Sequence, residues 1–451
     1  MEHSFGATSD NLIRREQEHF APAGRIPYYD VVLDHGRGAL LYDVDGNEYI
    51  DLLASASATN VGHCHPLVVQ AIKDQAEKLV HYTPAYFYHR PEIELVEKLA
   101  SIAPGTSPKK VVFGNSGSDA NDAIIKFARA YTGRQDIVSF VGAYHGSTYG
   151  SMSISAISLN MRRKMGPFLP GVHHIPYPDP QKPEVAGLSE EEQARYYMKP
   201  LEDMVASYLP AEDIACIIME PIAGDLGLVV PPQAYMDQLH AFCQKHGILF
   251  AVDEVNQGMG RTGTWWSIEH FGIEPDLMST AKSLASGMPL SAVIGKAEIM
   301  ESLDYPAHLF TTSGNPVCCA ASLATIAAIE QGGLIERSRT LGAYARERFE
   351  AMAEAFGIVG GVHGCGLNLG IDIVDAETGE KNVRDALKIV YEAARQGVLM
   401  ICIAGSVLRF QPPLVITDEQ LDRALAVLEQ AVTDVEAGRV PDSIVPAGRG
   451  W

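Results

Sequence analysis

Two short segments of the chain carry residue types that could do chemistry together. Asp253 ends an apolar run and begins Asp253-Glu254-Val255, and Lys282 lies further on, within Ser279-Thr280-Ala281-Lys282-Ser283. A lysine amine can hold an aldehyde as a Schiff base, and a carboxylate can keep a pyridine nitrogen protonated so that the ring accepts electrons. Pyridoxal phosphate needs both groups, so this pair predicts a pyridoxal-phosphate site.

A phosphate-binding loop and an aromatic ring complete this prediction. Ser116, Gly117 and Ser118 lie between an expected strand and an expected helix, where backbone N–H groups and hydroxyls can hold an anion. Ser-Gly-Ser before a helix is more often only a cap, but its place ahead of Asp253 and Lys282 favours phosphate binding. Tyr144, after another strand, could stack on the pyridine ring.

Strand-like and helix-like segments alternate along most of the chain, which predicts an α/β fold. Such alternation is typical of a mainly parallel sheet flanked by helices. The pattern changes near residue 336, where a smaller α+β domain is expected. The predicted organisation is an N-terminal segment (1–70), a large cofactor-binding domain (71–335) and a small C-terminal domain (336–451). The expected strands are 111–113, 137–140, 214–219, 248–253, 277–280 and 368–373, and the expected helices are 119–130, 232–246, 318–330, 335–356, 383–396 and 418–437.

Composition excludes several classes of partner. The net charge of −21 argues against binding to nucleic acid or to an anionic membrane, because such surfaces need clustered positive charge. The seven cysteines are scattered without metal-ligand spacing, so no metal site is predicted. The N-terminus has no leader pattern and no apolar run approaches the length of a membrane span, which favours a cytoplasmic enzyme.

The ordered motifs resemble those of the class III aminotransferases, pyridoxal-phosphate enzymes of fold type I. The resemblance runs from about Gly36 to Pro413. Besides the segments above, it rests on Asn60-Val61-Gly62-His63, Glu220-Pro221-Ile222, Gly260-Arg261-Thr262-Gly263 and Gly314-Asn315-Pro316.

The resemblance implies a role for individual residues. Lys282 would form the Schiff base and Asp253 would pair with the pyridine nitrogen. Val255 would pack beneath the ring and Tyr144 above it, while Ser116, Gly117 and Ser118 would hold the phosphate. Thr311 would reach the phosphate of a neighbouring subunit's cofactor. A homodimer is therefore implied as the smallest active unit, and a homotetramer is compatible with it.

The chain departs from the family pattern at several positions, among them Ser286-Gly287 after the lysine and Thr312 after the phosphate threonine. Members that use 2-oxoglutarate often carry an arginine where this chain has Ser147, so a second substrate carboxylate would lack that partner. Asn256 replaces the usual glutamine and is followed by Gln257, which leaves open the group that contacts the ring hydroxyl.

At closer range the chain resembles the amino-acid racemases inside this family. Inversion at Cα requires an acid/base on each face, and Lys282 supplies one. Asp225 is the candidate for the second, although a salt bridge between Asp225 and Arg409 competes with that role. In the racemase interpretation, Arg409 binds the substrate α-carboxylate.

The expected substrate is an aliphatic amino acid such as isoleucine, valine or leucine. Its side chain would lie near small and apolar groups at Ala54, Ser55, Ala85 and Tyr86, with Tyr28 or Tyr29 from the N-terminal segment. Two other functions remain open. One is a class III aminotransferase that transfers the amino group of a 4-aminobutyrate-like or other amine donor to an oxo acid, and the other is a binding protein that keeps the fold without catalysis. Retention of Lys282 disfavours the last.

Overall fold

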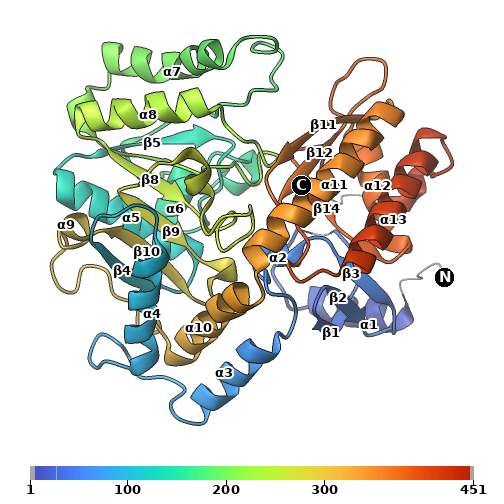
Figure 1. The fold of residues 1–451 in the computed structure, drawn as a ribbon, viewed down its shortest axis with the longest axis horizontal. Coiled ribbons are helices and arrows are strands. Elements are labelled where there is room, and N and C mark those ends of the chain that lie inside the picture. The colour runs from blue at the N-terminus through green and yellow to red at the C-terminus, as the bar shows by residue number, and fades with distance from the viewer. Residues whose placement is uncertain (1–5, 27, 447–451) are drawn as a thin grey trace. The chain divides into compact units, whose positions relative to one another are not determined.

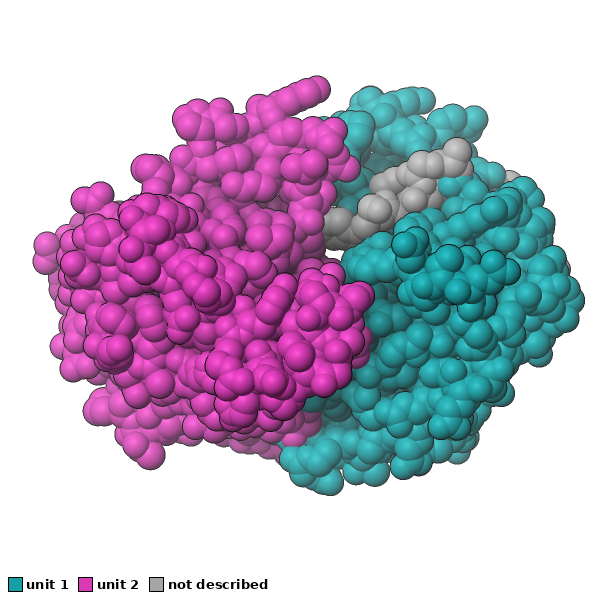
Figure 2. All heavy atoms as spheres, turned by 90° about the horizontal axis from the view of Figure 1, so that it is seen from above, with its two compact units in different colours: residues 1–65, 333–451 teal, residues 66–332 magenta. Residues whose placement is uncertain are grey.

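The chain folds into two compact units in a computed structural model that describes residues 6–26 and 28–446. Unit 1 comprises Met1–His65 and Gly333–Trp451, and unit 2 comprises Pro66–Gly332. Figure 2 draws the two units in different colours. The boundaries predicted from sequence, after residues 70 and 335, lie a few residues further along the chain.

Unit 2 contains a seven-stranded sheet in the order β4-β10-β9-β8-β7-β5-β6 (Figure 1). Strands β5 to β9 are parallel, while β10 runs antiparallel to both β4 and β9, so β4 points the same way as the parallel strands. The central strands β7 and β8 are buried along their whole length, as expected of a sheet covered on both faces. The strands are β4 (Lys109–Gly114), β5 (Asp136–Val141), β6 (Val172–Pro176), β7 (Ile214–Met219), β8 (Leu249–Asp253), β9 (Leu277–Thr280) and β10 (Ser291–Lys296).

Helices cover this sheet, and the one after β4 packs across most of it. Helix α5 (Gly117–Thr132) contacts β4, β7, β8, β9 and β10 through an apolar face that includes Ile124 and Phe127. Its start is fixed by a capping box between Ser116 and Asp119, and Gly133 ends it at a positive φ of 70°. Figure 1 shows α7 and α8 along the upper side of the sheet. The other helices are α3 (Pro66–Ala76), α4 (Arg90–Ile102), α6 (Tyr149–Ile154), α7 (Glu190–Ser207), α8 (Gln233–His246), α9 (Ala297–Met300) and α10 (Pro316–Gln331).

Unit 1 is formed by an N-terminal and a C-terminal segment of the chain and contains two four-stranded sheets. Their orders are β1-β2-β3-β13 and β11-β12-β15-β14. The parallel pairing of β3 with β13 aligns Ile50 with Val398, so the N-terminal segment shares a sheet with the C-terminal one. The strands are β1 (Leu33–Arg37), β2 (Leu40–Asp43), β3 (Glu48–Asp51), β11 (Val359–Gly364), β12 (Leu369–Ile373), β13 (Val398–Leu399), β14 (Ile401–Ile403) and β15 (Val407–Phe410); the helices are α1 (Ala7–Gln17), α2 (Ala54–Ser57), α11 (Leu334–Ala355), α12 (Val383–Arg395) and α13 (Asp418–Glu436).

The predicted fold class is confirmed. The expected strands and helices of the two domains are present, with ends that shift by a few residues. Sequence reasoning missed several elements, among them strands β1 to β3, β6, β10 and β11 and helices α4 and α7. The missed strands have four to six residues each, and so short an apolar pattern is hard to distinguish from a loop.

Within residues 6–26 and 28–446, no individual helix combines the length and the apolar character of a membrane span, although the consecutive helices α10 and α11 reach both together as a bent pair. The same residues contain no group of three or more His, Cys, Asp or Glu side chains that could hold a metal ion.

Substitution of Gly342 tests the packing of unit 1. Ala normally stabilises a helix interior by about 1 kcal/mol relative to Gly. A Cβ at Gly342 of α11, however, would lie 2.2 Å from the Gly366 carbonyl carbon. Gly342→Ala should therefore lower the free energy of unfolding by about 1–3 kcal/mol, measured by urea denaturation. The exposed neighbour Ala343 provides the control, because Ala343→Gly should cost about 1 kcal/mol through helix propensity alone. Stabilisation by Gly342→Ala would contradict the close contact.

Candidate active site

Five strands of unit 2 deliver the predicted chemical groups to one edge of the sheet. Strands β4, β5, β7, β8 and β9 point in the same direction, so their carboxyl ends share that edge. They are followed by Ser116, Tyr144, Glu220, Asp253 and Lys282 respectively, with Asp253 itself the last residue of β8. Open α/β sheets bind ligands at this edge.

Asp253 is a buried carboxylate held by three donors. Its Oδ2 accepts hydrogen bonds from the Asn121 amide at 2.8 Å and from His145 Nδ1 at 2.8 Å, and its Oδ1 accepts one from the Val255 backbone N–H at 2.9 Å. Burial acts to raise the pKa of Asp253, but the hydrogen bond and charge of His145, together with the other donors, hold that pKa below its ordinary value. The group therefore stays ionised, as a partner for a protonated pyridine nitrogen must.

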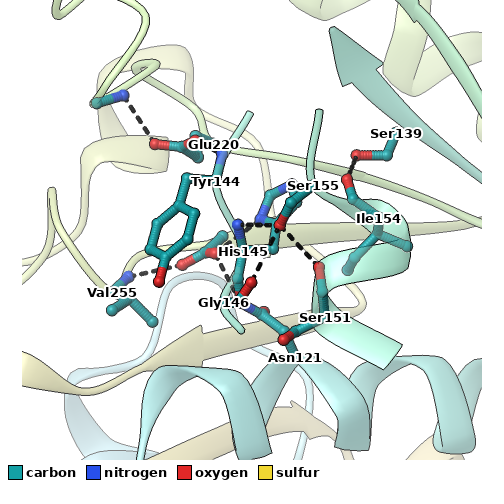
Figure 3. Close-up of polar contacts among 12 residues, drawn as sticks. Asn121, Ser139, Tyr144, His145, Gly146, Ser151, Ile154, Ser155, Glu220 and Val255 are labelled. Carbon is teal, nitrogen blue, oxygen red and sulfur yellow. Dashed lines mark hydrogen bonds and ion pairs between the residues drawn. The ribbon is translucent and has the colours of Figure 1, made fainter. Parts of the chain in front are cut away.

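The backbone around His145 and Gly146 forms a dense polar network (Figure 3). The His145 backbone N–H donates to the Ser155 hydroxyl at 2.8 Å, and the His145 carbonyl accepts from the Asn121 amide at 2.7 Å. Gly146 has a φ of 132°, and a Cβ there would lie 2.3 Å from the Ser118 hydroxyl oxygen. Only glycine fits this crossing beside the predicted phosphate loop.

The predicted phosphate loop lies against the segment expected beneath the ring. Ser116 caps α5, and the Ser118 hydroxyl accepts a hydrogen bond from the Ser147 backbone N–H at 3.0 Å. A Cβ at Gly117 would lie 3.0 Å from Cγ1 of Val255. The structure thus brings Gly117 and Val255 together, next to the Asp253 carboxylate.

Glu220 connects the two loops that carry Tyr144 and Asp225. Its Oε1 accepts the Tyr144 backbone N–H at 3.1 Å, and its Oε2 accepts the Gly224 N–H at 2.7 Å (Figure 3). Burial raises the pKa of Glu220 to about 7; the His145 charge opposes this rise, and the charges of Asp253 and Asp225 add to it. Tyr144 keeps its hydroxyl 3.0 Å from the Ser147 hydroxyl.

The remaining predicted residues of unit 2 are placed as follows. Lys282 follows β9 at a positive φ of 43° and is half-buried, as is Asp225. Asn256 is buried and Thr311 is exposed, while the neighbouring Thr312 donates to the Asn115 side chain at 3.0 Å, beside the phosphate loop. Tyr86 is 73% exposed on the segment between α3 and α4.

The predicted substrate residues Arg409, Ala54 and Tyr28 belong to unit 1. Arg409 is buried on β15, and its Nε donates to the Gln411 side-chain oxygen at 2.5 Å. Ala54 is fully buried and opens the turn α2. Tyr28 is buried within unit 1 and donates its hydroxyl to the Cys402 carbonyl, so its contact with substrate stays a prediction.

The turn α2 is left-handed. Ala54, Ser55, Ala56 and Ser57 have φ values of 47°, 51°, 53° and 69°. L-residues in this conformation cost roughly 1–2 kcal/mol each, so neighbouring groups must hold the turn in place.

Sequence reasoning missed two residues that complete the site. It assigned no role to His145, although it used the surrounding motif, and it did not identify Asn121. The available signal for Asn121 was a polar residue on the apolar face of α5, between Ala120 and Ala123. Such a residue is rarely buried without a polar partner.

Comparison with known proteins places this geometry in a family. Residues 21–432 match the family model described as aminotransferase class-III. The chain is 60% identical to isoleucine 2-epimerase of Lentilactobacillus buchneri, over 98% of this chain and 99% of that protein. It is 44% identical to leucine/methionine racemase of Thermococcus litoralis, over 98% and 99% respectively. A crystal structure of the omega transaminase from Pseudomonas jessenii in complex with PMP superposes with a TM-score of 0.86 at 29% identity, covering 98% of this chain and 97% of that one.

The raised pKa of Glu220 predicts how stability depends on pH. A carboxyl that titrates near pH 7 when folded, against an ordinary value of 4.5, stabilises the fold fully below pH 4.5 and loses that contribution as pH rises through 7. Gln does not titrate, so raising the pH from 5 to 8 should lower the free energy of unfolding of wild type by about 2.5 kcal/mol more than that of Glu220→Gln. Urea unfolding of both proteins at the two pH values measures this. A difference that does not change with pH would show that Glu220 has an ordinary pKa.

Proposed function

The chain belongs to the class III aminotransferase family, and from that membership we propose that it is a pyridoxal-phosphate-dependent racemase or epimerase of nonpolar amino acids. The 60% identity to an isoleucine 2-epimerase along nearly the whole chain carries this proposal. The expected substrates are isoleucine, which would become D-allo-isoleucine, and also valine and leucine. The second racemase among the relatives supports the same reaction class.

Pyridoxal phosphate is the cofactor, and the residues of unit 2 fit it. The ionised Asp253 would keep a proton on the pyridine nitrogen, and its pKa, held down by His145 and Asn121, suits that task. Ser116, Gly117 and Ser118 would hold the phosphate at the start of α5. Val255 would pack below the ring and Tyr144 above it, and Lys282 would bind the aldehyde. Bound pyridoxal phosphate supplies an electron sink that stabilises negative charge at Cα of an amino acid.

The protein must then move one proton at each face of Cα. We assign removal of the proton on one face to the Lys282 amine and its delivery on the other face to the Asp225 carboxyl. Arg409 would fix the substrate α-carboxylate through its planar guanidinium. Asn256 would lie where the family places the partner of the ring hydroxyl. An alternative role for Asp225 is to hold Arg409 by charge.

A class III aminotransferase is the second candidate. An omega transaminase of known structure shares the fold over 98% of this chain, so the fold itself is compatible with amino-group transfer. Ser147, whose backbone N–H donates to Ser118, supplies no cation for the second carboxylate of 2-oxoglutarate. Pyruvate would need no such cation.

We also propose that the active unit is at least a homodimer, with a homotetramer as the larger assembly compatible with it, and that the protein acts in the cytoplasm. Exposed apolar side chains gather between α3 and α4, where Val80, Phe87 and Tyr88 are 62%, 60% and 89% exposed. Apolar segments of this kind are common at protein interfaces. In a dimer, the exposed Thr311 would reach the partner's cofactor phosphate. The free cysteines fit a reducing compartment.

Incubation with L-isoleucine and pyridoxal phosphate in D₂O, without an oxo acid, separates the two candidate functions. The racemase proposal predicts catalytic accumulation of D-allo-isoleucine that carries deuterium at Cα, measured by chiral chromatography and mass spectrometry. Lys282→Ala should lose this turnover together with the visible absorbance of the lysine-bound cofactor. Absence of inversion, with release of the branched oxo acid once pyruvate is added, would identify an aminotransferase.

Replacement of Asp225 tests its proton-transfer role. Asp225→Asn keeps the shape of the side chain but removes its acidic proton, so inversion should fall by about 10²–10⁴-fold. Exchange of the Cα proton on the Lys282 face should fall much less. Asp225→Glu restores a carboxyl and serves as the control. Equal losses of inversion and exchange in Asp225→Asn would instead support the salt bridge to Arg409.

A further inference from the structure

The left-handed turn α2 is the least expected backbone feature of unit 1. Four successive residues, Ala54 to Ser57, have positive φ, and none of them is glycine. Positive φ is routine for glycine but strained for residues that carry a Cβ. Such conformations persist only where surrounding contacts enforce them, and they gather at functional sites.

The side chain of Asp51 enforces the start of this turn. Its Oδ1 accepts hydrogen bonds from the backbone N–H groups of Leu53 at 2.8 Å and of Ala54 at 3.0 Å. Its Oδ2 lies 2.8 Å from His63 Nε2, so the carboxylate is fixed from both sides. Asp51 is 2% exposed, and burial strengthens these bonds.

The far end of the turn is also anchored. The Ala58 N–H donates to the Ala54 carbonyl at 2.8 Å, and the Ser57 hydroxyl donates to the Asn60 side chain at 3.2 Å. Ala54 and Ser57 are fully buried, whereas Ser55 is exposed.

The segment that contains Asp51 and the turn is also hydrogen-bonded to Gln411, just after the strand of Arg409, the predicted carboxylate-binding residue. The Gln411 backbone N–H donates to the Leu52 carbonyl at 2.8 Å, and the Gln411 side chain accepts from Arg409 Nε. Leu52 therefore connects Gln411, which holds the Arg409 side chain, to the turn that begins at Ala54. Displacement of the turn would shift Ser55 relative to Arg409.

We propose that Asp51 is a positioning residue for substrate selection, which holds the left-handed turn so that Ser55 faces the side chain of the amino acid bound by Arg409. This role rests on the proposed racemase function. Without the carboxylate, the strained turn relaxes toward ordinary backbone angles, and the pocket wall loses its fixed distance from the arginine. A branched side chain, which fills more of the pocket than a methyl group, is affected most.

The test compares wild type and Asp51→Ala, both as holoenzymes, in the inversion of L-isoleucine and of L-alanine. We expect the ratio of kcat/KM for inversion of isoleucine to that of alanine to fall about tenfold in Asp51→Ala. Asp43→Ala is the matched control, since Asp43 is also buried in unit 1 and caps another turn through the N–H groups of Asp45 and Asn47. It should lower the unfolding temperature while it leaves the ratio unchanged.

A second substitution distinguishes strain from general damage. In an Asp51→Ala, Ala56→Gly double variant, glycine adopts the positive φ without a Cβ penalty, so the isoleucine-to-alanine ratio should recover in part. An unchanged ratio in Asp51→Ala, or the absence of recovery in the double variant, overturns the proposal while inversion by wild type still supports the racemase function. If wild type inverts neither amino acid, the proposed function fails and the role of Asp51 falls with it.

Discussion

The buried negative charge of Asp253 is the constraint on which the site of unit 2 depends. An ionised carboxylate inside a protein is costly unless several donors surround it. Here the donors are Asn121 from α5, His145 from the loop after β5, and the backbone of Val255. To meet this one requirement, the fold must bring a helix and two strand ends together. The same arrangement brings the predicted phosphate loop and ring-stacking tyrosine to the carboxylate.

Glu220 and Asp253 show how the local environment gives different pKa values to two carboxyl groups of similar intrinsic acidity. Both are buried, but Asp253 has His145 and the Asn121 amide, while Glu220 has two backbone N–H groups and neighbouring negative charge. The pKa of the first therefore falls and that of the second rises to about 7. Opposed shifts of this kind assign different tasks to neighbouring acids. Asp253 can hold a charge, while Glu220 holds two loops in register without adding a second full charge at neutral pH.

The groups proposed to bind the cofactor and those proposed to choose the reaction are of different kinds. The phosphate loop, Asp253 and Lys282 fit a cofactor common to the whole family, in which a racemase and a transaminase are both relatives of this chain. Reaction choice is instead proposed to depend on Asp225, and substrate choice on the turn that Asp51 holds. Cofactor binding needs an ordered set of donors. Selectivity between substrates instead depends on differences in size of about one methylene group, each of which changes the binding free energy by roughly 1–3 kcal/mol.

The sequence by itself determined the fold class and, through the ordered positions of Lys282, Asp253 and the predicted phosphate loop, the resemblance to a family that uses pyridoxal phosphate. These follow from local signals, because apolar strands end at residues whose types suit one chemistry. Only the tertiary structure decided that His145 and Asn121 hold the Asp253 carboxylate, since residues so far apart in sequence meet through sheet order, which periodicity does not encode. The left-handed conformation of Ala54 to Ser57 was equally hidden. Local propensity disfavours it at every one of these residues, and contacts from Asp51 and Asn60 impose it.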